Sequence, residues 1–230
     1  MFRLTSGLAV CSLIVLPGFA AAQGSEAMIV GNFSESGSAF YQLVYTRDIS
    51  DSGFAVRLDL AYGSYDTFYD SIGGTAETER ARLMLRYAFD VAPTAVVTLS
   101  GGVSYEATSV SPNTANSPEE TSETGTFAAI DLYWLDDWDN ALFATAEIDS
   151  VDADYYSARY LANFGGFSLG PTANYIIEGD YSRRALGVSV EVPFTSGNGE
   201  VLATLATTEA DFDGGSEDAN YFELLVRMEF

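Results

Sequence analysis

The chain has 230 residues, of which 33 are acidic and ten are basic, and its formal charge is −23 at pH 7. A chain this acidic repels phosphate, so nucleic acid is excluded as a partner. The absence of histidine excludes a Ser–His or Asp–His catalytic arrangement and removes the usual nitrogen ligand of zinc. Carboxylate-pair catalysis stays open in principle, but no acidic pair stands out. We therefore expect neither an enzyme nor a cofactor.

The N-terminus has the pattern of a cleaved signal peptide covering residues 1–22. A basic start is followed by an apolar run at 8–16, and small residues precede Gln23. The run is too short for a transmembrane helix, which needs about 20 apolar residues. The one cysteine, Cys11, lies too early for a lipoprotein signal, so we expect an exported mature chain, 23–230, that contains no thiol.

Twelve segments of the mature chain alternate between apolar and polar residues, which is the period of a β-strand. In one of them Val56 and Leu58 fall on one face, whereas Arg57 and Asp59 fall on the other. The predicted strands are 27–33, 38–47, 53–65, 78–89, 94–106, 124–135, 141–149, 154–164, 166–178, 182–192, 199–208 and 219–230. Alternating segments of about ten residues separated by turn residues are typical of a transmembrane β-barrel.

The last strand carries the most specific pattern. Phe222, Leu224, Val226 and Met228 alternate with charged residues, and the chain ends at Phe230. A terminal aromatic that closes such a strand resembles the C-terminal signature of Gram-negative outer-membrane β-barrels, which the barrel-assembly machinery reads. This resemblance implies an all-β fold, a closed antiparallel transmembrane barrel formed by residues 23–230, and a location in the outer membrane.

The lengths of the predicted connections agree with a barrel whose two termini lie at the periplasmic end. Counting back from Phe230, the connections predicted at this end are short, at 48–52, 90–93, 136–140, near Gly165 and 193–198. The opposite, extracellular end receives the long connections, at 66–77, 107–123 and 209–218. Outer-membrane barrels have this asymmetry and an even number of strands. Twelve strands are therefore predicted, with ten as the alternative.

Aromatic residues on the predicted outer face collect near the two ends of the strands. Those beside periplasmic turns are Phe54, Phe89, Trp134, Phe164, Phe167 and Phe230. Those toward the outer ends are Tyr62, Tyr105, Tyr156, Tyr175 and Phe222. Two aromatic girdles around an apolar band are typical of a bilayer-spanning barrel. A soluble β-sandwich with an aromatic core is the alternative, but it does not explain this placement.

The same alternation predicts which charged side chains line the lumen. The basic ones are Arg57, Arg80, Arg82, Arg86, Arg159, Arg183 and Arg227. The acidic ones are Asp59, Asp131, Glu147, Glu178, Glu191, Glu200 and Glu223. Two interpretations are open: Arg–carboxylate pairs that fill the lumen, or a constriction with a transverse field, similar to the basic and acidic walls of porins. The first four arginines lie on two adjacent strands and would form one basic wall.

The predicted function is a porin-like channel for passive diffusion of small hydrophilic solutes or ions, with a preference for cations. The alternative is a closed structural or surface-interaction barrel with acidic extracellular loops and no transport. Expected partners are outer-membrane lipid and lipopolysaccharide, together with the assembly machinery that reads the strand ending at Phe230. The acidic stretch 211–218 lacks the spacing of a calcium-binding loop, so no specific metal site is expected.

Overall fold

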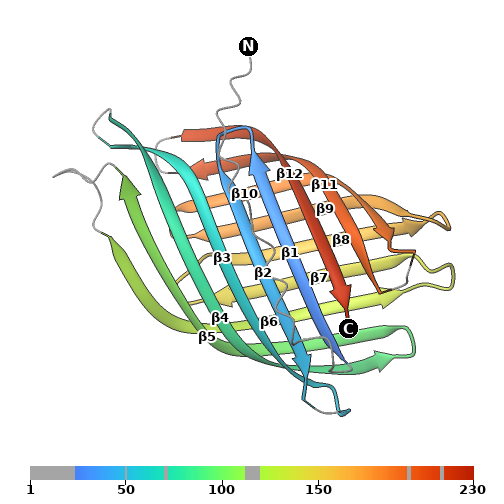
Figure 1. The fold of residues 1–230 in the computed structure, drawn as a ribbon. Coiled ribbons are helices and arrows are strands. Elements are labelled where there is room, and N and C mark those ends of the chain that lie inside the picture. Colours follow the sequence, from blue (N-terminus) through green and yellow to red (C-terminus); the bar gives the residue numbers. More distant parts are fainter. Residues whose placement is uncertain (1–23, 50, 70–71, 112–119, 196–197, 213–214) are drawn as a thin grey trace.

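The computed structural model describes residues 24–49, 51–69, 72–111, 120–195, 198–212 and 215–230, so the predicted signal peptide lies outside the described residues. The described chain is built from twelve strands (Figure 1). They are β1 (Ser25–Ser34), β2 (Ala39–Asp48), β3 (Phe54–Tyr69), β4 (Ile72–Ala92), β5 (Ala95–Ser111), β6 (Thr121–Leu135), β7 (Ala141–Asp149), β8 (Asp154–Asn163), β9 (Ser168–Glu178), β10 (Tyr181–Pro193), β11 (Gly199–Phe212) and β12 (Gly215–Glu229). The predicted number of strands is confirmed.

Each strand pairs antiparallel with the next one along the chain, and the first pairs with the last to close the barrel. The closing pair runs from Glu26 opposite Glu229 to Ser34 opposite Tyr221. Closure gives every strand a hydrogen-bonded neighbour on each side, as a bilayer requires. The fold predicted from the sequence is confirmed, and the sandwich alternative and the ten-stranded alternative are wrong.

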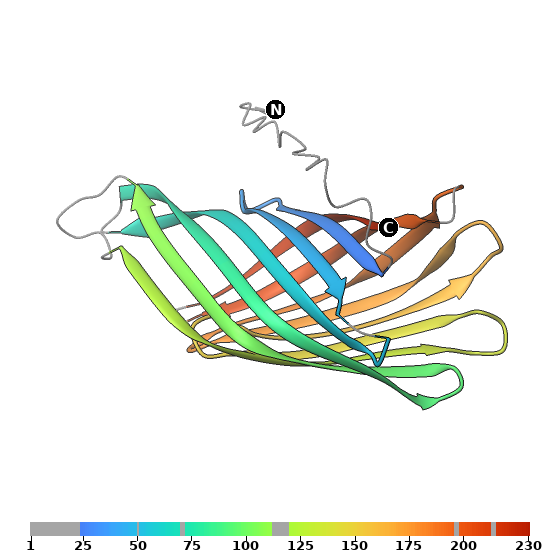
Figure 2. The ribbon, with the colours of Figure 1, turned by 60° about the horizontal axis from the view of Figure 1, so that its bottom comes forward.

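Three predicted loops are wrong in their bounds, because strands occupy much of them. The segment 66–77 belongs mostly to β3 and β4, which are 16 and 21 residues long. In the same way, β5 and β6 enter 107–123, and β11 and β12 enter 209–218. Beyond the bilayer both faces of a strand meet water, so the sequence loses its alternation while backbone pairing continues. The ends of β3–β6 therefore project beyond the neighbouring hairpins, at the left of Figure 1 and of Figure 2.

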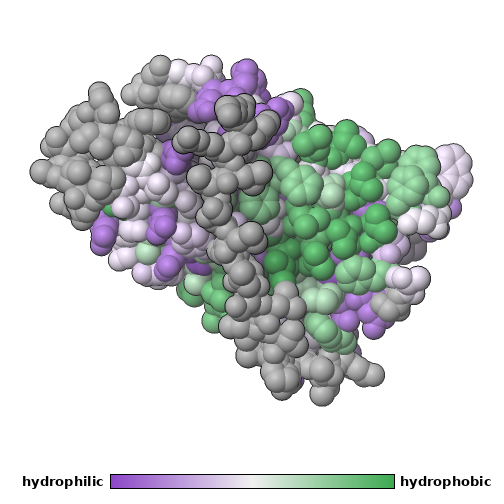
Figure 3. Space-filling model, turned by 45° about the horizontal axis from the view of Figure 1, so that its top comes forward, coloured by the Kyte–Doolittle hydropathy of each residue, from purple (hydrophilic) through white to green (hydrophobic). Residues whose placement is uncertain are grey.

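The outer surface of the wall is apolar. Leu58, Leu85 and Leu99 are all exposed on it. Figure 3 shows a broad apolar area with hydrophilic residues toward both ends. Soluble monomers rarely expose apolar patches of more than a few hundred Å². Within the described residues no helix is long and apolar enough to cross a bilayer.

Aromatic pairs lie on this surface toward both ends of the barrel. At the end that carries the termini, Phe54 packs against Tyr87 with ring centroids 4.6 Å apart, and the Phe164–Phe167 distance is 5.3 Å. Toward the opposite end the Phe33–Tyr41 and Tyr156–Tyr175 pairs have centroid distances of 5.6 and 6.4 Å. Rings at both levels match the two polar–apolar interfaces of a bilayer.

The β6–β7 connection, at the end of the barrel that carries the termini, is stabilised by the side chain of Asp136. Asp136 accepts hydrogen bonds from the backbone of Trp138 (2.8 Å) and from both the side chain and the backbone of Asn140 (2.7 and 2.9 Å). Together these bonds, led by that of the Asn140 side chain, hold the pKa of Asp136 below its usual value. Asp139 adopts φ of 60°, a conformation that Asp tolerates better than most residues. Backbone hydrogen bonds from Asp136 to Asn140 (3.0 Å) and from Asp139 to Asp136 (3.2 Å) close the same turn.

Candidate functional site

The inner face of the wall is formed by the residues that alternate with the exposed apolar ones. All of the charged positions predicted to line the lumen belong to this face by strand alternation and register. On β3, for example, Leu58 and Leu60 are exposed outside, whereas Asp59 between them is buried inside. Because each strand has charges on one face and apolar groups on the other, the barrel separates a charged interior from a lipid-facing exterior.

Four arginines of β3 and β4 form the basic wall. Arg57 and Arg86 each lie within salt-bridge distance of a carboxylate, at 3.6 Å from Asp59 and 3.4 Å from Asp131. Arg80 contacts Asp152, and its guanidinium carbon lies 5.5 Å from the centre of the Phe40 ring. A side-chain amide, that of Gln42, donates to Asp59 over 2.7 Å. The basic wall is therefore compensated by acids and by aromatic faces.

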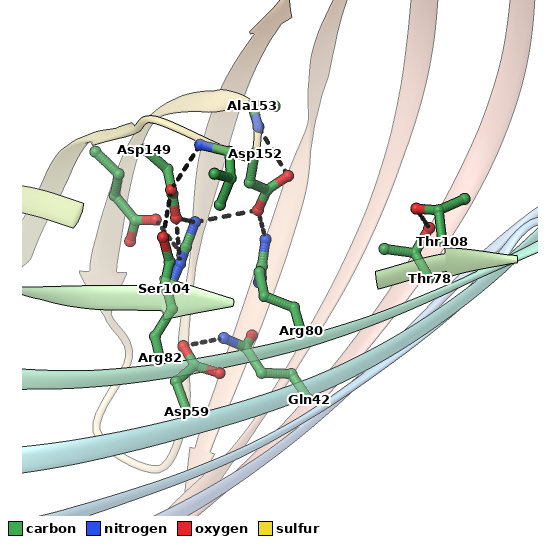
Figure 4. A network of polar contacts seen from close by, with 12 residues as sticks. Gln42, Asp59, Thr78, Arg80, Arg82, Ser104, Thr108, Asp149, Asp152 and Ala153 are labelled. Carbon is green, nitrogen blue, oxygen red and sulfur yellow. Dashed lines mark hydrogen bonds and ion pairs between the residues drawn. The ribbon is translucent and has the colours of Figure 1, made fainter. Parts of the chain in front are cut away.

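Arg82, the fourth arginine of the basic wall, is the centre of a network of ion pairs and hydrogen bonds (Figure 4). Its Nε and Nη2 each lie 2.8 Å from Oδ2 of Asp149, and its Nη1 lies 3.2 Å from Glu147. The guanidinium carbon is 4.4 Å from the centre of the Phe127 ring. Ser104 donates to Oδ1 of Asp149 over 2.7 Å. The side chains of Arg82 and Asp149 are 4% and 0% exposed, so this pair is almost completely removed from water.

Sequence reasoning missed two acids of this network. Asp149 follows Glu147 by two residues at the end of a predicted strand, so alternation could have found it. Asp152 lies in the β7–β8 turn, where no strand periodicity applies, and it still reaches Arg82 at 3.1 Å. Glu106 was also missed, although it continues the inner face of β5 two residues beyond Ser104.

The wall formed by β8–β12 has fewer ion pairs. Arg227 lies 3.2 Å from Glu200, and Arg159 has its guanidinium carbon 5.1 Å from the centre of the Phe143 ring. Neutral hydrogen bonds join Asn174 to Tyr221 over 2.7 Å and Ser189 to Thr204 over 2.8 Å. In the part of the chain that the structure describes, no ion pair within 4.0 Å involves Arg183, Glu178, Glu191 or Glu223. The predicted lumen residues thus form most of their ion pairs on one wall, and the Arg227–Glu200 pair lies on the other.

The interior is closely packed in places and reaches water in others. Val44, Leu161 and Leu202 point inward and are at most 1% exposed, so no water contacts them. The side chains of Arg86, Asp131 and Arg227 keep 19%, 30% and 32% of their area accessible. These three charged side chains are therefore only partly buried.

Comparisons with known proteins place the chain in a family. Residues 24–230 match the sequence model of the family described as cellulose biosynthesis protein BcsS. No curated protein matches the sequence. Among solved structures, LpxR from Salmonella typhimurium is 11% identical, with a TM-score of 0.53 over 90% of this chain and 100% of that chain. The β domain of the Bordetella autotransporter BrkA is 16% identical, with a TM-score of 0.53 over 91% of this chain and 100% of that chain.

A porin has a similar fold. The NanC porin is 9% identical and has a TM-score of 0.52, and the match covers 89% of this chain and 100% of that chain. At such low identity these similarities concern the fold alone, which is that of outer-membrane β-barrels. The family match covers all of the described strands. The chain is an outer-membrane β-barrel and belongs to the BcsS family of cellulose biosynthesis proteins.

Proposed function

We propose that this barrel is a narrow channel through which small hydrophilic solutes or ions diffuse across the outer membrane of cellulose-producing cells. The observation that carries the proposal is the charged inner wall, whose side chains stay partly accessible to water inside a closed barrel. Charged side chains that line a pore and stay accessible are the groups with which passing ions interact. The fold shared with the NanC porin supports a channel, and the family description supports a link to cellulose biosynthesis.

The channel should prefer cations. Glu106, Asp149 and Asp152 join the predicted acids of the interior, so carboxylates outnumber arginines there. Most of the arginines are paired with these acids, whereas several carboxylates of β9–β12 have no basic partner within 4.0 Å among the described residues. A net negative lining raises the local concentration of cations.

Conductance across a planar bilayer tests the proposal. Purified folded barrels should insert and give discrete current steps in potassium chloride, and neutral-pH recordings should show a reversal potential of the sign expected for cation passage. The absence of current from barrels that show the heat-modifiable migration of folded protein would contradict a channel. Anion selectivity would contradict the cation preference alone.

A closed barrel with a structural or surface-interaction role in cellulose production is the second candidate. Its support is the dense packing of Val44, Leu161 and Leu202 on the inner face. In that case the charges would form ion pairs that connect the strands across a filled interior. Folded barrels would then give no current. Neither candidate includes catalysis, because the chain has no histidine and a single cysteine in the predicted signal peptide.

A further inference from the structure

The β7–β8 turn, residues 150–153, continues to bond to the wall after β7 has ended. β7 is only nine residues long, whereas its neighbour β6 is 15 residues long. The backbone N–H of Ser150 donates to the carbonyl oxygen of Thr126 over 3.1 Å, and the Thr126 N–H donates to Oγ of Ser150 over 2.8 Å. The turn is therefore fixed against β6 and does not extend freely into solvent.

The turn lies over the inner face of β6. Gly125 belongs to this face, since it alternates with the inward Phe127. A Cβ atom at Gly125 would lie 2.1 Å from Ser150 Oγ and 2.7 Å from Val151 Cγ1, both far inside contact distance. The two side chains thus occupy the space that any other residue at position 125 would fill, which places the turn within the mouth of the barrel.

Asp152 connects the turn to the basic wall on β4, across β5 and β6. Its Oδ2 lies 3.1 Å from Nη2 of Arg82 and contacts Arg80, while its Oδ1 accepts from the N–H of Ala153 over 2.7 Å (Figure 4). The backbone N–H of Val151 donates to Asp149 over 3.1 Å. Two ion pairs therefore span the interior from the turn to a strand that is not its neighbour in the sheet.

We propose that the β7–β8 turn is the constriction of the lumen and that the bonds of Asp152 to Arg80 and Arg82 hold it in the mouth. The position of the turn is inferred from geometry alone. Its effect on the passage of solutes rests on the proposed channel. Release of the turn should widen the passage, because Ser150, Val151 and Asp152 would leave the inner face. The turn and its two arginine partners would then determine the largest solute that passes.

Two variants release the turn in different ways. Asp152→Ala removes both ion pairs and leaves Arg82 with Asp149 and Glu147. Gly125→Val keeps every charge and displaces the turn sterically. Their matched controls are Asp180→Ala, in the exposed β9–β10 turn, and Gly101→Val, where an added Cβ has only an ordinary contact at 3.8 Å. We expect several-fold higher single-channel conductance from Asp152→Ala, a changed conductance from Gly125→Val, whose side chain takes the space that Ser150 and Val151 leave, and unchanged conductance from both controls.

Unchanged conductance in release variants that fold as the wild type would overturn the constriction. If no variant and no wild-type barrel conducts, the channel proposal fails, and the position of the turn is decided separately by thiol labelling. Cys11 belongs to the predicted signal peptide, so Val151→Cys supplies a single thiol. Adding Asp152→Ala should raise its rate of reaction with a bulky water-soluble maleimide by about tenfold or more, since a tenfold change corresponds to only 1.4 kcal/mol. Equal rates with Asp152→Ala and with Asp180→Ala would show that Asp152 does not hold the turn.

Discussion

Arg82 shows how one buried charge depends on its surroundings. It has three carboxylates and an aromatic ring as partners, and its side chain is almost completely buried. Taking an arginine and an aspartate out of water is costly, and their mutual attraction offsets that cost only when the remaining hydrogen bonds are also made. Here Ser104 and the backbone of Val151 supply those bonds to Asp149. The network therefore fixes the geometry of four strands more than it adds net stability.

We predict that Arg82→Ala lowers the free energy of unfolding by about 3–5 kcal/mol, because it leaves Asp149 buried without a cation. Arg227→Ala is the matched comparison. Arg227 forms an ion pair with Glu200, and 32% of the arginine side chain is exposed. Exposed ion pairs contribute only about 0–1 kcal/mol to stability. Urea unfolding of the two variants in lipid vesicles, followed by tryptophan fluorescence, measures the difference. Equal losses would mean that the buried pair has no special role.

At the scale of strands, the sequence predicts the segments that lie within the bilayer. Alternation is clear wherever one face meets lipid and the other the lumen, as at Val97, Leu99 and Val103 of β5, and these strands and their orientation were predicted. Alternation is absent where both faces meet water, as around Glu77 and Glu79 of β4, so the ends of the longest strands were missed. The period of two carries information about the surroundings of a strand and none about its length.

The interior ion network was predictable only in part, for a related reason. Strand phase predicts that a side chain points inward, but a partner is decided by barrel closure, which brings together residues far apart in sequence. Arg82 and Asp149 are separated by 67 positions and two intervening strands. Asp152 lies in a turn, and only the inward fold of that turn brings it to β4. The predicted lumen residues therefore include only part of the charged wall and none of its contacts.

The orientation of β5 predicts different effects of an added arginine at two adjacent positions. Leu99 faces outward and is 46% exposed, whereas Thr98 faces inward, opposite Asp131 of β6. Leu99→Arg should destabilise the barrel by about 2–4 kcal/mol if position 99 lies near the bilayer midplane, where a lipid-facing arginine is most costly. Thr98→Arg should cost much less, because its charge reaches a hydrated acidic interior. Urea unfolding in vesicles compares them, and the reverse order would show that the strand has the opposite orientation.

At the scale of the whole molecule, the barrel combines an uncharged lipid-facing belt with an unevenly charged interior. Basic residues gather on β3 and β4, and the acids of β6 and β7 turn toward them. The acids of β9–β12 face the same lumen with fewer basic partners among the described residues. A solute in the lumen therefore lies between a compensated wall and a wall with excess negative charge. This asymmetry predicts that selectivity responds in opposite directions to the loss of an arginine and the loss of a glutamate.

Two single variants test this asymmetry without breaking the buried pair at Arg82. Arg86→Gln removes a partly accessible positive charge and should increase the preference for cations, whereas Glu200→Gln removes a negative charge from the opposite wall and should decrease it. Reversal potentials across a salt gradient measure both shifts. The shifts should shrink as salt is raised, since accessible charges are screened over about 8 Å at physiological ionic strength. Shifts of the same sign in both variants would mean that the lumen charges do not act on the passing ion, and that selectivity arises at the acidic rim instead.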